Sequence, residues 1–144
     1  MNQVVIIDFN RTLYNPDNNK LEESAISVLE YLSTRAILIL LGKGTESRQD
    51  LIDTLNIKKY FQKIIIIEEK NIEQLEAIKN QYAHISIFFS IGDRIKKEIT
   101  LGNEMGFKTI WFKKGKFSLE APQHEHEIPW KTVTSLKEIE LYIN

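Results

Sequence analysis

Five short, predominantly apolar segments divide this chain, and stretches with helical spacing separate them. The segments cover residues 4–7, 37–41, 64–67, 85–91 and 109–112. Uninterrupted runs rich in Val and Ile are typical of strands that are covered on both faces. A strict alternation of such strands with amphipathic helices predicts an α/β fold, a three-layer Rossmann-like sandwich around a five-stranded parallel sheet with right-handed crossovers.

Helices are predicted where apolar residues recur every three or four positions. Such faces lie within residues 25–32, 51–55, 72–82 and 95–105. Ser135 and Glu138 have the spacing of a capping box, which predicts a last helix running to Ile143. Residues 113–131 contain two prolines and are predicted to be a loop, with the lysines of 113–116 in a solvated turn.

The composition excludes several classes of protein. The 144 residues suffice for one domain, taken as 1–144, with one sizeable core. Nineteen basic residues balance twenty acidic ones, so the overall charge gives no reason to expect binding to nucleic acid or to a membrane surface. The absence of cysteine excludes a disulfide framework, a thiolate zinc site and a cysteine nucleophile. Without a recognisable signal peptide or a long apolar span, the protein is expected to be cytoplasmic.

Charged side chains follow three of the predicted strands at the point where each strand ends. Asp8 follows the first strand, Lys70 comes shortly after the third, and Asp93 follows the fourth. Ligands of open α/β sheets bind beyond the carboxyl ends of the strands, so these three side chains are expected to converge. Two carboxylates with an ammonium group suit a Mg²⁺-assisted phosphoryl-transfer site. For any one of these residues, capping of the next helix is an equally good interpretation.

Two sequence motifs resemble those of the haloacid dehalogenase-like (HAD-like) hydrolase superfamily. The first is Asp8-Phe9-Asn10-Arg11-Thr12-Leu13, which is similar to the Asp-x-Asp-x-Thr loop of that family. The second is Ile91-Gly92-Asp93 followed by Glu98, which is similar to the family's closing acidic motif. The resemblance covers most of the chain and implies the strand order 5-4-1-2-3, with Asp8 after the central strand.

The resemblance also implies roles for individual residues. Asp8 would be the nucleophile that forms an aspartyl-phosphate, and Lys70 would neutralise the nucleophile and the phosphate. Mg²⁺ would be held by Asp8, the backbone carbonyl of Asn10 and Asp93, with Glu98 supporting the metal site. Thr12 would shape the loop around the nucleophile.

The chain departs from the family pattern at two positions. The second aspartate of the first motif, the acid and base of the family reaction, is Asn10 here. An amide cannot exchange a proton near neutral pH, which typically slows a reaction by about 10²- to 10⁴-fold. Gly42 stands where the family places a phosphate-binding Ser or Thr. The N–H groups of Gly42, Lys43 and Gly44 could form an anion-binding nest instead, or Thr45 could take that role.

Two hypotheses about function follow. In one, the protein is a slow or specialised Mg²⁺-dependent phosphohydrolase; in the other, it is a metal- or phosphate-binding or regulatory module without useful turnover. The stretches between the first motif and the second strand, and from Gly42 to Lys70, have no room for a cap domain. The expected open site favours a macromolecular substrate, although the phosphorylated substrate could be small or macromolecular. A second subunit of a homodimer is an alternative source of a lid. A P-loop is rejected because Lys43 precedes Gly44 and not Ser or Thr, and a receiver domain would place its acidic residues differently.

Overall fold

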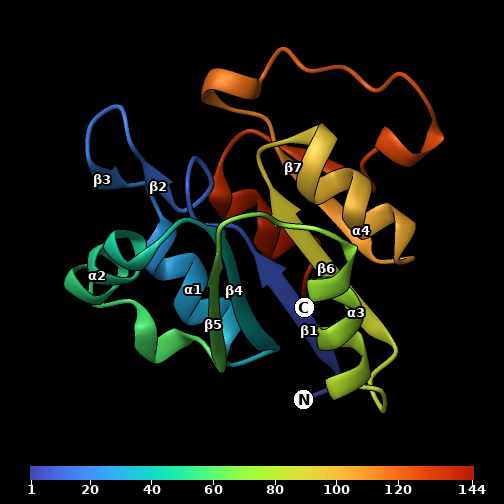
Figure 1. Ribbon diagram of the computed structural model, residues 1–144, viewed down its shortest axis with the longest axis horizontal. Coiled ribbons are helices and arrows are strands. Elements are labelled where there is room, and N and C mark those ends of the chain that lie inside the picture. Colours follow the sequence, from blue (N-terminus) through green and yellow to red (C-terminus); the bar gives the residue numbers. More distant parts are fainter.

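The computed structural model describes residues 1–144, which form a parallel β-sheet with helices on both faces (Figure 1). The order of the six strands across the sheet is β5-β4-β1-β6-β7-β8. Their bounds are β1 Gln3–Ile7, β4 Ile37–Lys43, β5 Lys63–Ile67, β6 Ile87–Gly92, β7 Lys108–Phe112 and β8 Lys131–Val133. The α/β class and the parallel sheet predicted from the alternation are confirmed.

The prediction of a five-stranded sheet is wrong, because a sixth strand extends one edge. β8 pairs in parallel with β7 through Ile110↔Lys131, Trp111↔Thr132 and Phe112↔Val133. The five segments identified in the sequence keep the neighbours that the family order implies: β1 pairs with β4 and β6, β4 with β5, and β6 with β7. The structure therefore differs from the predicted sheet only at the edge beside β7, and β1 has a strand on each side.

The two faces of the sheet explain why residues 4–7 of β1 are apolar without interruption. Val5 and Ile7 of β1 belong to one core cluster with α1 (Ala25–Ser33), whereas Val4 and Ile6 belong to another with α3 (Ile72–Gln81). Because successive side chains of a strand point to opposite faces, a sheet covered on both sides needs apolar residues at every position. In Figure 1, α1 and α3 lie on opposite sides of the central strands.

The remaining helices are short. α2 spans Glu46–Thr54 and α4 spans Thr100–Glu104, directly after a π-helical segment, Ile95–Ile99. Short 3₁₀ segments lie at Lys58–Tyr60, Gly115–Phe117, Glu125–Glu127 and Leu136–Leu141. Ser135 and Glu138 form the expected capping box, but the helix that they open is 3₁₀ and not α. No helix combines the length and the apolar character that crossing a bilayer requires.

Two segments outside the sheet lie near its carboxyl edge. Strands β2 (Tyr14–Asn15) and β3 (Lys20–Leu21) form a small antiparallel hairpin between β1 and α1. Residues 113–130 fold back over the same edge, where Lys114 forms an ion pair of 2.7 Å with Glu22 and Glu120 accepts a hydrogen bond of 3.1 Å from the N–H of Ile95. The predicted loop is therefore anchored to the core.

Candidate active site

The sheet places the two aspartates of the motifs side by side. β1 and β6 are neighbours in register at Ile7↔Ile91, and Asp8 and Asp93 follow their carboxyl ends. The N–H of Asp8 donates to the carbonyl of Ile91 over 3.0 Å, which extends the ladder into the first motif. The predicted convergence is therefore what the parallel pairing produces.

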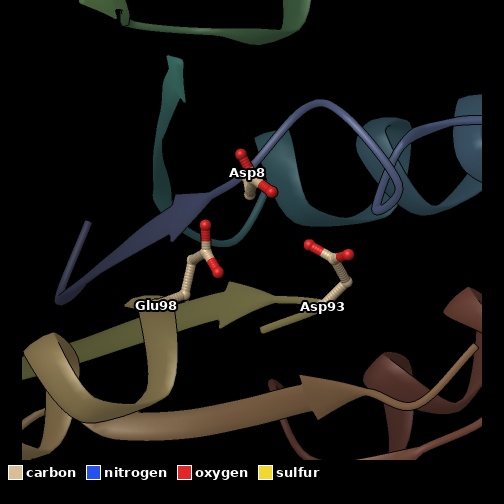
Figure 2. A group of neighbouring side chains, drawn as sticks. All are labelled: Asp8, Asp93 and Glu98. Atoms are coloured by element: carbon tan, nitrogen blue, oxygen red, sulfur yellow. The ribbon is translucent and has the colours of Figure 1, made fainter. Parts of the chain in front are cut away.

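Three carboxylates meet at this point. One oxygen from each of Asp8, Asp93 and Glu98 lies within 4.8 Å of the others. Figure 2 shows the three side chains pointing toward one another, Asp8 from the end of β1 and Asp93 from the end of β6. Asp8 and Asp93 are buried and the side chain of Glu98 is 10% exposed, so the cluster holds its charge away from water.

Lys70 is the cation that balances this cluster. Its Nζ atom lies 2.6 Å from Oδ1 of Asp8 and 2.8 Å from Oε1 of Glu98, and its side chain is 8% exposed. The hydroxyl of Thr12 donates to Oδ2 of Asp8 over 3.4 Å. The structure thus brings Lys70 and Thr12 to the two oxygens of the proposed nucleophile.

Burial sets the protonation behaviour of the cluster. It raises the pKa of Asp93 from 3.8 to about 8, and the negative charges of Asp8 and Glu98 act in the same direction. It also raises the pKa of Asp8 to about 6, although the ammonium group of Lys70 acts to lower it. Burial alone would lower the pKa of Lys70, but its two ion pairs outweigh burial and hold this pKa above its usual value.

The donor set fits a hard divalent cation. Oδ2 of Asp93 and Oε2 of Glu98 are buried and have no hydrogen-bond partner, which is costly for a carboxylate oxygen. Mg²⁺ is bound through one or two carboxylates together with water and phosphate oxygens. Asp93 and Glu98 therefore supply unsatisfied oxygens that a magnesium ion would complete, with Asp8 beside them as a further carboxylate.

This arrangement predicts a pH-dependent stabilisation by Mg²⁺. Between pH 3.8 and about 8 folded Asp93 holds a proton that unfolded Asp93 has lost, so the free energy of unfolding falls as the pH rises. Without metal we expect this free energy to drop by about 2 kcal/mol between pH 6 and pH 8. Added Mg²⁺ should reverse the drop at pH 8 and act weakly at pH 6, as measured by urea unfolding. Asp93→Asn should flatten the metal-free profile, and equal Mg²⁺ effects at both pH values would contradict the prediction.

Two residues to which the sequence analysis gave no role support the acids. Gly92 faces Glu98 so closely that a Cβ at this position would overlap the Cγ of Glu98 and lie 2.6 Å from its Cβ. The indole N–H of Trp111 donates to the carbonyl of Asp93 over 2.9 Å. Glu98 itself lies in the π-helical segment, a distortion that is frequent at functional sites. The glycine in the second motif was the only one of these signals visible in the sequence.

The three acids and Lys70 line a cavity of about 380 Å³, and the other charged residues of its walls are mostly cations, with Glu69 as the one further acid. The further cations on its walls are Arg11, Lys43, Arg94, Lys97 and Lys116. Lys116 belongs to the segment predicted to be a solvated turn, and residues 113–116 are exposed as predicted. Lys116 also lines the cavity, which the sequence did not predict. An anionic ligand therefore meets cations on the way to the carboxylate cluster.

The predicted phosphate-binding segment is only partly at the cavity. Gly42 and Lys43 lie in β4, and of the four residues 42–45 only Lys43 lines the carboxylate cavity. The N–H of Gly44 donates to the carbonyl of Ile67 over 2.8 Å, so it is engaged in the sheet and is not free for an anion. Gly44 and Thr45 line a neighbouring hollow instead.

Comparisons with known proteins agree with this geometry. Residues 71–139, slightly less than half of the chain, match a family model described as HAD-hydrolase-like. A HAD-like hydrolase from Burkholderia xenovorans superposes with a TM-score of 0.82 over 96% of this chain and 94% of its own, at 11% identity. The chain has the HAD-like fold. The resemblance to this superfamily that the two motifs indicated is confirmed.

Two other solved structures are similar over different shares of their length. An uncharacterised protein from Listeria monocytogenes has a TM-score of 0.77 and 18% identity, over 97% of this chain and 96% of that one. The HAD-hydrolase YfnB of Bacillus subtilis, described as bound to magnesium, has a TM-score of 0.72 and 19% identity, but the chain spans only 57% of it. No curated protein sequence matches the chain. Likeness at this level of identity concerns the fold alone.

Proposed function

We propose that the protein is a Mg²⁺-dependent phosphohydrolase that uses Asp8 as its nucleophile. The observation that carries the proposal is the buried cluster of Asp8, Asp93 and Glu98 with two unpartnered oxygens, next to Lys70 at 2.6 Å from Asp8. The match of residues 71–139 to a HAD-hydrolase-like family model supports such a reaction, and the cations on the walls of the cavity suit a phosphorylated substrate.

In this proposal Asp8 attacks the phosphorus atom and forms an aspartyl-phosphate, which water then hydrolyses. Lys70 holds one oxygen of Asp8 and orients the other. Mg²⁺, when bound by Asp8, Asp93 and the Asn10 carbonyl with Glu98 in support, supplies positive charge that offsets the charge of the phosphoryl oxygens. The cations Lys43, Arg94 and Lys116 attract the substrate to the cavity.

Asn10 limits this reaction. Its amide cannot protonate a leaving group or take a proton from water, so both steps proceed without that help. This is the observation that favours a second candidate function, a module that binds Mg²⁺ and phosphate without useful turnover. The two candidates share the same site and differ in the rate of hydrolysis.

The test is phosphatase activity on p-nitrophenyl phosphate together with calorimetric binding of inorganic phosphate, both with and without Mg²⁺. The phosphohydrolase proposal predicts slow turnover that EDTA abolishes and Mg²⁺ restores. Phosphate binding that depends on Mg²⁺, with turnover no faster than that of the Asp8→Asn variant, would favour the binding module. Neither turnover nor phosphate binding would contradict both candidates.

A further inference from the structure

A second hollow adjoins the carboxylate cavity on the side of α2. It has a volume of about 450 Å³, and Asn10 and Pro16 line both spaces. Arg48 is the one charged residue on its walls, and the hydroxyl-bearing side chains of Thr45 and Ser47 lie beside it. The hollow is therefore a separate space with one positive charge, that of Arg48. It begins at Asn10, the position where the family has its acid.

Arg48 carries a charge that no carboxylate in the structure neutralises. Its Nη1 atom donates to Oδ1 of Asn10 over 3.5 Å, and its guanidinium lies 5.2 Å from the centre of the Phe9 ring. It takes part in none of the ion pairs of the protein, although its side chain is partly buried. A partly buried cation whose one hydrogen-bond partner is neutral is well suited to receive an anion.

The side chain of Arg48 can reach Asn10 because residue 44 is a glycine. A Cβ at residue 44 would lie 2.6 Å from the Cβ and 2.9 Å from the Cγ of Arg48. Any side chain there would displace the arginine stem from its path toward Asn10. Gly44, which the sequence placed in a possible phosphate-binding nest, therefore leaves the space that the side chain of Arg48 occupies.

The first step of the proposed hydrolysis needs a cation beside the leaving group. When the bond between phosphorus and the leaving oxygen breaks and no acid stands at Asn10, the leaving group departs with its electron pair and without a proton. We propose that Arg48 binds this departing anion, and that the site therefore acts on acyl phosphates and phosphoanhydrides, whose leaving groups are stable as anions. This inference rests on the proposed phosphohydrolase function and specifies its substrate class.

Both steps of this reaction can proceed without a proton donor at Asn10. A carboxylate oxygen of Asp8 forms a bond to phosphorus while the bond to the leaving group breaks, and the carboxylate or phosphate that leaves takes the electron pair. Water then attacks the aspartyl-phosphate, Asp8 regains its carboxylate, and the products are inorganic phosphate and a proton that passes to solvent. Arg48 acts only in the first step, by charge and hydrogen bonding.

A leaving-group series tests the inference through turnover. We expect kcat/KM for acetyl phosphate and for pyrophosphate to exceed that for glycerol 2-phosphate, whose alkoxide is a poor leaving group. Arg48→Ala should lower kcat/KM for the first two by about 10²-fold, the typical effect of removing one donor from an oxyanion, and Arg48→Lys should restore part of it. Arg35→Ala, which removes an arginine after α1, is the control and should leave all three rates within about twofold. Equal losses for all three substrates in Arg48→Ala would overturn the inference.

A binding measurement separates this inference from the proposed function. In Mg²⁺ we expect methylenebisphosphonate, a non-hydrolysable phosphoanhydride analogue, to bind about tenfold more tightly than methylphosphonate by calorimetry, and Arg48→Ala to remove the difference. If this preference is found and no turnover occurs, the leaving-group site stands and the phosphohydrolase proposal fails. If turnover occurs but Arg48→Ala keeps the preference, or wild type shows none, the inference on Arg48 fails.

Discussion

Asp8→Asn is expected to reduce kcat by about 10⁴-fold or more, which is the largest effect that the proposed mechanism predicts. The amide has the shape of the carboxylate but cannot attack phosphorus, and it removes one ligand from the metal site. Because Asp8 is buried beside Lys70, the variant also shows whether the position matters through chemistry or through packing. Turnover of acetyl phosphate in Mg²⁺ is the measurement, with circular dichroism to verify folding.

Asp53→Asn is the matched control for this variant. Asp53 is exposed on α2 and pairs only with Lys58 over 3.2 Å, so the same chemical change there should leave turnover unaffected. A folded Asp8→Asn protein that retains wild-type turnover would mean that another residue is the nucleophile.

Lys70→Met is expected to impair both activity and stability. The variant leaves the carboxylates of Asp8 and Glu98 buried without their shared cation, and breaking a buried ion pair on one side typically costs about 3 kcal/mol or more. We expect a loss of about 3 kcal/mol in the free energy of unfolding at pH 8 without metal, and a loss of about 10²-fold in kcat in Mg²⁺.

The pH dependence of this loss gives it a specific signature. Burial raises the pKa of Asp8 even with Lys70 beside it, and removing Lys70 raises this pKa further. At low pH Asp8 is therefore protonated and no longer needs the cation, so the deficit in the free energy of unfolding should shrink. Lys79→Met, a change on the exposed face of α3, should cost little at any pH. A deficit of the same size at pH 5 and pH 8 would mean that Lys70 stabilises the fold by packing and not by charge.

The parts of the fold that could be predicted are those with a strong local signal. The strands β1, β4 and β6 are apolar on both faces, and such runs need no knowledge of their partners to be identified. Parallel pairing then forces Asp8 and Asp93 to one edge, because the carboxyl ends of neighbouring strands meet there. Their proximity follows from topology, and the structure adds the distances and the burial.

The sixth strand could not be predicted in the same way. β8 is three residues long, Lys131 to Val133, and only its last residue is buried. It follows a long irregular segment, and pairing with β7 at the edge of the sheet is what makes it a strand. A three-residue run with one apolar position carries no period that distinguishes it from a loop.

Contacts between distant segments could not be predicted from the sequence either. Lys116 reaches the cavity because Glu120 and Lys114 anchor the segment to Ile95 and Glu22, more than twenty residues away. Arg48 looks like an ordinary polar residue of α2, and its contact with Asn10 depends on the absence of a side chain at Gly44. Such roles arise from packing and leave no spacing to detect.

The most direct test of the central claim is the mass of the acid-quenched protein after brief reaction with acetyl phosphate in Mg²⁺. Hydrolysis of the intermediate lacks a base at Asn10, so the phosphorylated form should accumulate during turnover. We predict one added phosphoryl group, located on the peptide that contains Asp8, lost in hydroxylamine and absent from the Asp8→Asn protein. A wild-type protein that turns over substrate with no phosphoryl group on Asp8, or with one on another residue, would contradict the account.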